Sequence, residues 1–196
     1  MHLTLFSTPV VNTVLRAGSR AFLTLKGWRV EGALPASARR CVLIAAPHTS
    51  NWDLPYTLMV GFALDLNLYW MGKASLFRGP FGPVMRWLGG IAVDRSRSNN
   101  LVAASAQALR EGEGPLQLVV PPEGTRGKVR HWKTGFYFIA MQADVPIVLA
   151  FMDYGRKVGG LGPEFTPSGN VDEDMVRIKR FYAGVQGRNP AQFEAE

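Results

Sequence analysis

The chain has 196 residues, enough for one domain with a sizeable core, and 47% of them are hydrophobic. With 22 Lys and Arg against 15 Asp and Glu, the net charge of +7 favours anionic partners such as lipid headgroups or nucleic acid. No apolar run reaches the roughly 20 residues of a bilayer-spanning helix, so we expect neither a transmembrane helix nor a signal peptide.

The first thirty residues have the pattern of a basic amphipathic helix. Apolar side chains recur there at helical spacing among the cations Arg16, Arg20 and Lys26. Such a helix can lie in a membrane interface, with its apolar face down and its cations on anionic headgroups. Packing of the same face on the core of the domain explains the pattern equally well. We therefore predict an amphipathic N-terminal segment over 1–30, followed by a domain over 31–196.

Short apolar strands then alternate with helices along the chain. The strands are predicted over 26–30, 41–46, 66–71, 91–93, 116–120 and 145–151. The helices are predicted over 53–64, 82–88, 99–111, 133–143 and 172–182, with strand and loop between the last two. This alternation predicts a single α/β domain, with a mostly parallel or mixed central sheet flanked by helices. In such a sheet, ligands bind at the carboxyl edge of the strands.

The most informative pair in the chain is His48 and Asp53. The apolar run 41–46 ends at Pro47, so it predicts a buried strand that delivers His48 at its carboxyl end. Pro55 fits only the first turn of a helix, so Asp53 lies near a helix N-terminus, which favours an anion. An Asp on one ring nitrogen leaves the other nitrogen to take a proton from an alcohol. A loop histidine beside a helix-capping Asp is the alternative interpretation.

A second predicted strand, 116–120, also ends in polar residues, namely Glu123, Gly124, Thr125 and Arg126. Gly124 lets the backbone turn or approach a ligand closely, and Thr125 offers a hydroxyl. Arg126 offers the planar fork that holds a phosphate with two hydrogen bonds. Alone, this stretch is as well explained by an ordinary polar turn. The two motifs in this order are much more specific than either one.

Together the motifs resemble those of the glycerophosphate and lysophosphatidate acyltransferases, the PlsC-like or lysophospholipid acyltransferase family. Residues 48–53 resemble the first block of the family, a catalytic His-x4-Asp. Residues 73–95 resemble its second block, with a Lys, a Gly and an Asp-Arg pair that help to form the acceptor pocket. Residues 122–126 resemble the third, Pro-Glu-Gly-Thr-Arg, and 145–148 the fourth, a hydrophobic strand with Pro. The resemblance covers most of the chain.

The resemblance implies an enzyme of phospholipid synthesis that moves a fatty acyl group from a thioester to a lysophosphatidate-type acceptor. The donor would be acyl-coenzyme A or acyl carrier protein, with neither a metal nor a further cofactor. His48 would be the general base and Asp53 its orienting partner. The resemblance also implies a cytoplasmic protein at the membrane face, in peripheral contact through residues 1–30.

The resemblance also assigns the substrate-binding residues. Arg126 would bind the acceptor phosphate, within a loop that includes Gly124 and Thr125. Glu123 would order this Arg or contact an acceptor hydroxyl. Lys73 and Arg95 are further candidates, although a solvated surface charge explains each of them equally well.

The sequence also leaves alternatives open. Pro121, Gly127 and Leu149 depart from the usual residues of the family, so the acceptor could be another lysolipid, an aminoacyl lipid or a glycolipid. A basic lipid-binding or nucleic-acid-binding module would fit the net charge, but the cations are dispersed and form no recognised RNA-binding signature. A phosphate-binding NTPase would need a Gly-x4-Gly-Lys-Ser/Thr loop, which the chain lacks. We therefore expect no nucleic-acid partner.

Overall fold

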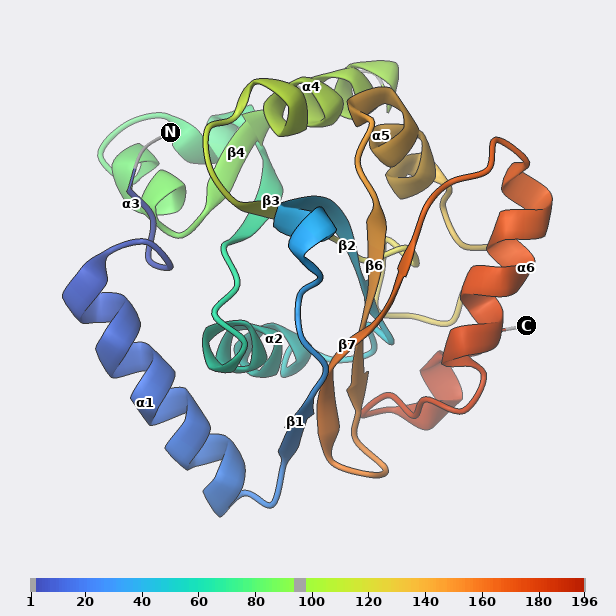
Figure 1. Ribbon diagram of the computed structural model, residues 1–196, viewed down its shortest axis with the longest axis horizontal. Coiled ribbons are helices and arrows are strands. Elements are labelled where there is room, and N and C mark those ends of the chain that lie inside the picture. The colour runs from blue at the N-terminus through green and yellow to red at the C-terminus, as the bar shows by residue number, and fades with distance from the viewer. Residues whose placement is uncertain (1–2, 94–97, 196) are drawn as a thin grey trace.

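The computed structural model describes residues 3–93 and 98–195 (Figure 1). Within these residues seven strands form one sheet, in the order β1-β7-β6-β2-β5-β3-β4. The strands are β1 Arg29–Glu31, β2 Arg40–Ala46, β3 Leu68–Lys73, β4 Gly90–Val93, β5 Leu116–Val120, β6 Ile147–Asp153 and β7 Val158–Phe165. Every neighbouring pair is parallel except β6 and β7, which are antiparallel. The expected α/β fold with a mixed sheet is confirmed.

Helices cover both faces of this sheet. The α-helices are α1 Pro9–Leu25, α2 Asp53–Ala63, α3 Gly82–Trp87, α4 Ser98–Glu111, α5 Gly135–Ala143 and α6 Val171–Tyr182. Because side chains alternate along a strand, Val42 and Ile44 of β2 face the core beneath α4, α5 and α6. Cys41 and Leu43 face the opposite core, which α2 covers. Cys41 is fully buried and unpaired, so its role is packing.

The expected N-terminal helix is present as α1, and its two sides have different environments. One side packs on α2, where Leu23 is 1% exposed and the Arg20 guanidinium donates to the Ala63 carbonyl over 2.8 Å. The other side carries apolar side chains in water, with Val14 64% and Leu25 85% exposed. Core packing therefore accounts for only part of the amphipathic pattern.

The element bounds differ from expectation mainly where turns intervene. β1 begins at Arg29, because α1 continues to Leu25 and the chain turns before pairing with β7. The expected boundary at residue 30 consequently falls inside a strand of the sheet. The helix expected from 133 begins at Gly135, because the Lys133 N–H donates to the Pro122 carbonyl outside any helix. In the described part of the chain, no helix is both long and apolar enough to span a bilayer.

A buried amide holds the strand that leads to the second motif. Gln117 of β5 is fully buried; its Oε1 accepts from the Asn67 N–H over 2.6 Å and its Nε2 donates to the Arg39 carbonyl over 2.8 Å. These bonds tie β5 to the segments that precede β3 and β2. A buried backbone group that loses its partner costs about 1–3 kcal/mol.

We therefore expect Gln117→Leu to lower the free energy of unfolding by about 2–4 kcal/mol, because it removes two hydrogen bonds between the buried amide and the backbone groups of Asn67 and Arg39. Urea denaturation followed by circular dichroism measures the change. Gln107→Leu on the exposed face of α4 is the matched control and should change stability by less than about 0.5 kcal/mol. Equal stability of the two variants would contradict this role for the Gln117 amide.

Candidate active site

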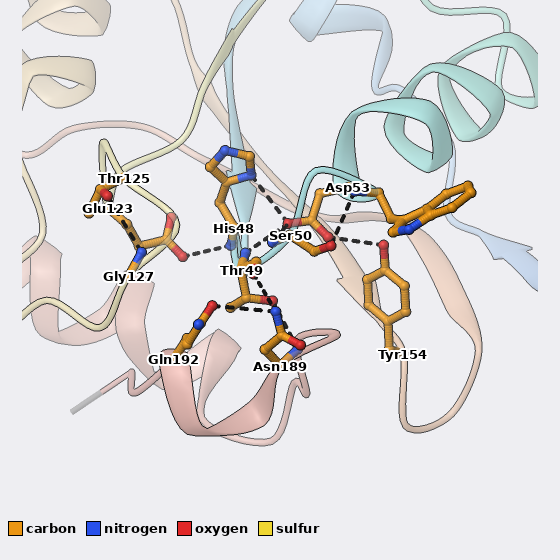
Figure 2. Close-up of polar contacts among 11 residues, drawn as sticks. His48, Thr49, Ser50, Asp53, Glu123, Thr125, Gly127, Tyr154, Asn189 and Gln192 are labelled. Atoms are coloured by element: carbon orange, nitrogen blue, oxygen red, sulfur yellow. Dashed lines mark hydrogen bonds and ion pairs between the residues drawn. The ribbon is translucent and has the colours of Figure 1, made fainter.

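The two motifs meet because their strands are parallel neighbours. β2 pairs with β5 in a register that places Ile44 opposite Val120, so both strands end at the same edge of the sheet. Residues 47–52 lead from β2 into α2, and residues 121–134 lead from β5 into α5. Figure 2 shows His48 between Asp53 on one side and the loop that carries Glu123 on the other.

Asp53 is the first residue of α2 and holds the imidazole of His48. Its Oδ2 lies 3.3 Å from His48 Nδ1, and its side chain is 5% exposed. The same oxygen accepts from the backbone N–H groups of Thr49, over 2.7 Å, and Ser50, over 2.8 Å. Its Oδ1 accepts from the Tyr154 hydroxyl over 2.9 Å.

These contacts determine the charge state of Asp53. Burial disfavours the Asp53 carboxylate, but the hydrogen bonds from His48, the backbone and Tyr154 outweigh it and hold its pKa below the usual value. An ionised Asp53 at neutral pH accepts a hydrogen bond from Nδ1–H, which leaves Nε2 as the nitrogen that can accept a proton. The His48 side chain is 23% exposed, so a substrate can reach it. The arrangement suits a general base.

Glu123 lies beneath His48 and not in the exposed part of the site. It is 3% exposed, and its Oε1 accepts from the His48 N–H over 2.8 Å. Among the described residues its Oε2 has no hydrogen-bond partner. Burial raises the pKa of this carboxyl, and the His48 N–H only partly offsets that effect. The structure thus joins Glu123 to the backbone of the loop that carries His48. Its expected contact with the Arg or an acceptor hydroxyl stays a prediction.

Gly124, Thr125 and Arg126 form the exposed turn beyond Glu123. Gly124 has φ of +65°, and a Cβ there would come within 2.8 Å of the Lys133 Nζ, so only glycine fits this turn without strain. No ion pair among the described residues involves the Arg126 guanidinium. An unpaired guanidinium at the rim of the site is available to an anion.

The other two expected cations are less informative. Lys73 ends β3, which pairs with β5, so it lies at the same edge of the sheet as the two motifs. It is exposed there. Arg95 lies outside the described residues.

The sequence analysis missed a third group of residues, which comes from the C-terminal part of the chain. Asn189 Nδ2 donates to the Thr49 carbonyl over 2.7 Å, and its N–H donates to Thr49 Oγ1 over 3.2 Å. With its amide oriented to pair donors with acceptors, Gln192 donates to the carbonyls of Thr49, over 2.8 Å, and Arg126, over 2.9 Å. Figure 2 shows both amides below Thr49. Residues 186–192, the C-terminal strap, therefore connect the two motif loops, which are residues 47–52 after β2 and residues 121–134 after β5.

The sequence analysis also missed Tyr154, and the position of this residue shortly after a predicted strand could have indicated it. β6 is the other parallel neighbour of β2, and the register pairs Ala46 with Phe151. The residues that follow β6, including Tyr154, must therefore reach the same edge as His48. No local pattern marks Asn189 or Gln192.

An apolar cavity adjoins His48 between the sheet and α2. Its walls include Leu43 of β2, Val60 and Gly61 of α2, and Leu161 of β7. Gly61 brings the helix close to the sheet, since a Cβ there would lie 2.5 Å from Leu68. The site therefore combines a proton acceptor with an apolar compartment.

Comparisons with known proteins show which proteins the chain is similar to. The chain is 33% identical over 169 residues to human 1-acyl-sn-glycerol-3-phosphate acyltransferase beta, a match that covers 80% of this chain and 58% of that relative. The chain thus spans less than two thirds of the human protein. The crystal structure of the 1-acyl-sn-glycerophosphate (LPA) acyltransferase PlsC from Thermotoga maritima has the same fold, with a TM-score of 0.59. That match has 22% identity and covers 87% of this chain and 78% of the other.

A family model also matches the part of the chain that contains the site. The model, described as Acyltransferase, covers residues 28–152, which include His48, Asp53 and residues 123–126. This is more than half of the chain. The chain belongs to the acyltransferase family.

Proposed function

We propose that this protein transfers an acyl group from a thioester to the hydroxyl of a lysophosphatidate-type glycerolipid, with His48 as the general base. The observation that carries the proposal is the contact between His48 Nδ1 and the buried, ionised Asp53, which leaves His48 Nε2 as proton acceptor. Family membership and the name of the human relative support the acyl group and the acceptor class.

The reaction then needs one proton acceptor and no protein nucleophile. His48 Nε2 takes the proton of the acceptor hydroxyl while its oxygen bonds to the thioester carbonyl carbon. The resulting oxyanion collapses and breaks the carbon–sulfur bond, and His48 returns the proton to the departing thiolate of coenzyme A or of acyl carrier protein. The Asp53 carboxylate stabilises the imidazolium between these steps.

The surroundings of His48 supply a place for each substrate. Arg126, exposed and without an ion pair among the described residues, would bind the acceptor phosphate. The apolar cavity beside His48, with a volume of about 40 Å³, would take only the part of the acyl chain next to the thioester, because its walls are mostly apolar side chains and glycine. Lys73 and Arg95 stay as weaker candidates for binding the acceptor.

We further propose peripheral contact with the membrane through α1. Val10, Val14 and Leu25 lie on one side of this helix and are 75%, 64% and 85% exposed, away from the side that packs on α2. The segment that precedes α1 is tied to α3, because the Leu5 N–H donates to the Trp87 carbonyl. Phe81, next to α3, is 71% exposed as well. Exposed apolar side chains on a protein with a net charge of +7 suit the interface of an anionic bilayer.

We expect His48→Ala to lower kcat for acceptor-dependent thiol release by about 10²–10⁴-fold, because it removes the proton acceptor. The assay uses a long-chain acyl-coenzyme A or acyl carrier protein donor, with and without lysophosphatidate. His131→Ala is the matched control and should keep wild-type activity. His131 is exposed and lies between Arg126 and α5. Equal activity of wild type and His48→Ala would refute the proposal, and so would no release with any donor and lysolipid.

Replacement of Arg126 distinguishes a phosphate acceptor from a neutral one. A lost charge-assisted hydrogen bond pair corresponds to about 1.5–3 kcal/mol, so Arg126→Ala should raise the KM for lysophosphatidate about 10- to 100-fold. The KM for a neutral monoacylglycerol should hardly change. Arg110→Ala on α4 is the control for a lost surface cation. An unchanged KM for lysophosphatidate would indicate that the acceptor is instead a lysolipid without a terminal phosphate, or a glycolipid.

We expect Val14→Asp to weaken binding to vesicles of phosphatidylcholine and phosphatidylglycerol by at least about tenfold. The substitution puts a charge on the side of α1 that we propose to enter the membrane. Vesicle flotation measures the bound fraction. Gln107→Asp, an exposed position on α4, makes a matched change elsewhere and should bind like wild type. An equal loss of vesicle binding in both variants would indicate that binding depends on the net charge of the protein and not on contact through α1.

A further inference from the structure

Asp53 receives a hydrogen bond from outside the two motifs. Tyr154 follows β6 directly, beyond the span of residues 28–152 that the family model matches. Its hydroxyl donates to Asp53 Oδ1 over 2.9 Å, whereas the contacts with His48, Thr49 and Ser50 all involve Oδ2. The two carboxylate oxygens therefore have separate sets of partners. Figure 2 shows the Tyr154 ring on the side of Asp53 away from His48.

The ring of Tyr154 is held in place on several sides. It makes edge-to-face contacts with Trp28 and Tyr56, at centroid distances of 5.1 and 5.7 Å. The Arg188 guanidinium of the C-terminal strap lies 5.9 Å from its centroid, and the Tyr154 N–H donates to the Gln186 carbonyl over 2.9 Å. A side chain restrained this way can aim its hydroxyl at one atom with little loss of entropy.

The Tyr154 hydroxyl can act only as a donor to Asp53. Burial, and then the charge of the neighbouring Asp53 carboxylate, raise the pKa of this phenol well above its usual value. It therefore keeps its proton throughout the pH range in which an acyltransferase would work. Asp53 in turn is ionised, so its Oδ1 is an acceptor.

We infer that Tyr154 is a positioning residue, which fixes the plane of the Asp53 carboxylate so that Oδ2 faces His48 Nδ1. This inference rests on the proposed function of His48 as general base. A carboxylate anchored through one oxygen alone can rotate about its Cβ–Cγ bond, and the second anchor on Oδ1 removes that freedom. Tyr154 does not touch the reacting atoms; it acts through Asp53.

Kinetics of Tyr154→Phe test the inference, because the substitution removes the hydroxyl and keeps the packed ring. We expect kcat to fall about 5- to 20-fold with the KM of donor and acceptor unchanged. Tyr137→Phe is the matched control, since the Tyr137 hydroxyl donates to Asp174 over 2.8 Å in the same kind of pair, between α5 and α6. It should leave kcat unaltered. Wild-type kcat in Tyr154→Phe would overturn the inference.

A double-mutant cycle separates a role through Asp53 from a general structural role. If Tyr154 acts only on the Asp53 carboxylate, adding Tyr154→Phe to Asp53→Asn should cost less than twofold in kcat. The same 5- to 20-fold loss in the Asp53→Asn background would show that Tyr154 acts independently of Asp53, and would overturn the inference.

A readout without turnover separates this inference from the proposed function. In ¹⁵N-histidine NMR, with the signals assigned by His48→Ala, wild type should show His48 protonated mainly at Nδ1. Tyr154→Phe should show a mixture of the two tautomers. An unchanged tautomer would overturn the positioning role even if acyl transfer is confirmed. A changed tautomer without acyl transfer would uphold the positioning role and refute only the proposed reaction.

Discussion

The parallel pairing of β2 between β5 and β6 is the constraint on which the site depends. Parallel neighbours that end in register place their following residues at one edge of the sheet, so three segments far apart in the sequence come together there. His48 follows β2, Glu123 follows β5 and Tyr154 follows β6. Shared hydrogen bonds then join the segments. The sheet therefore serves both as hydrophobic core and as scaffold of the site.

Asp53 contacts His48 and also residues of the segments that follow β2 and β6. As the first residue of α2 it lies where the helix dipole favours a negative charge, and the N–H groups of Thr49 and Ser50 stabilise it further. A carboxylate in this state stabilises an imidazolium without becoming protonated itself. Glu123 has a different role, because its buried carboxyl holds the backbone of His48 and not the ring.

The C-terminal strap extends the site beyond the span that the family model matches. Asn189 and Gln192 contact Thr49 in the loop that carries His48, and Arg188 lies over the rings of Trp52 and Tyr154. Neither motif loop contains a helix or strand, and hydrogen bonds from the strap hold the backbone of both loops. The end of the chain thus helps to preorganise a site whose chemical groups come from its first two thirds.

The sequence by itself determined the α/β order, the strand-loop-helix corner at 41–53 and the strand and polar turn at 116–126. Apolar runs, Pro55 and Gly124 are local signals, and local signals are set by short-range sterics and burial. Only the tertiary structure decided that Glu123 would lie beneath His48, that Tyr154 would complete the partners of Asp53 and that Asn189 would hold Thr49. These contacts depend on strand order and register, which are fixed by packing between elements distant in sequence and leave no local pattern to recognise.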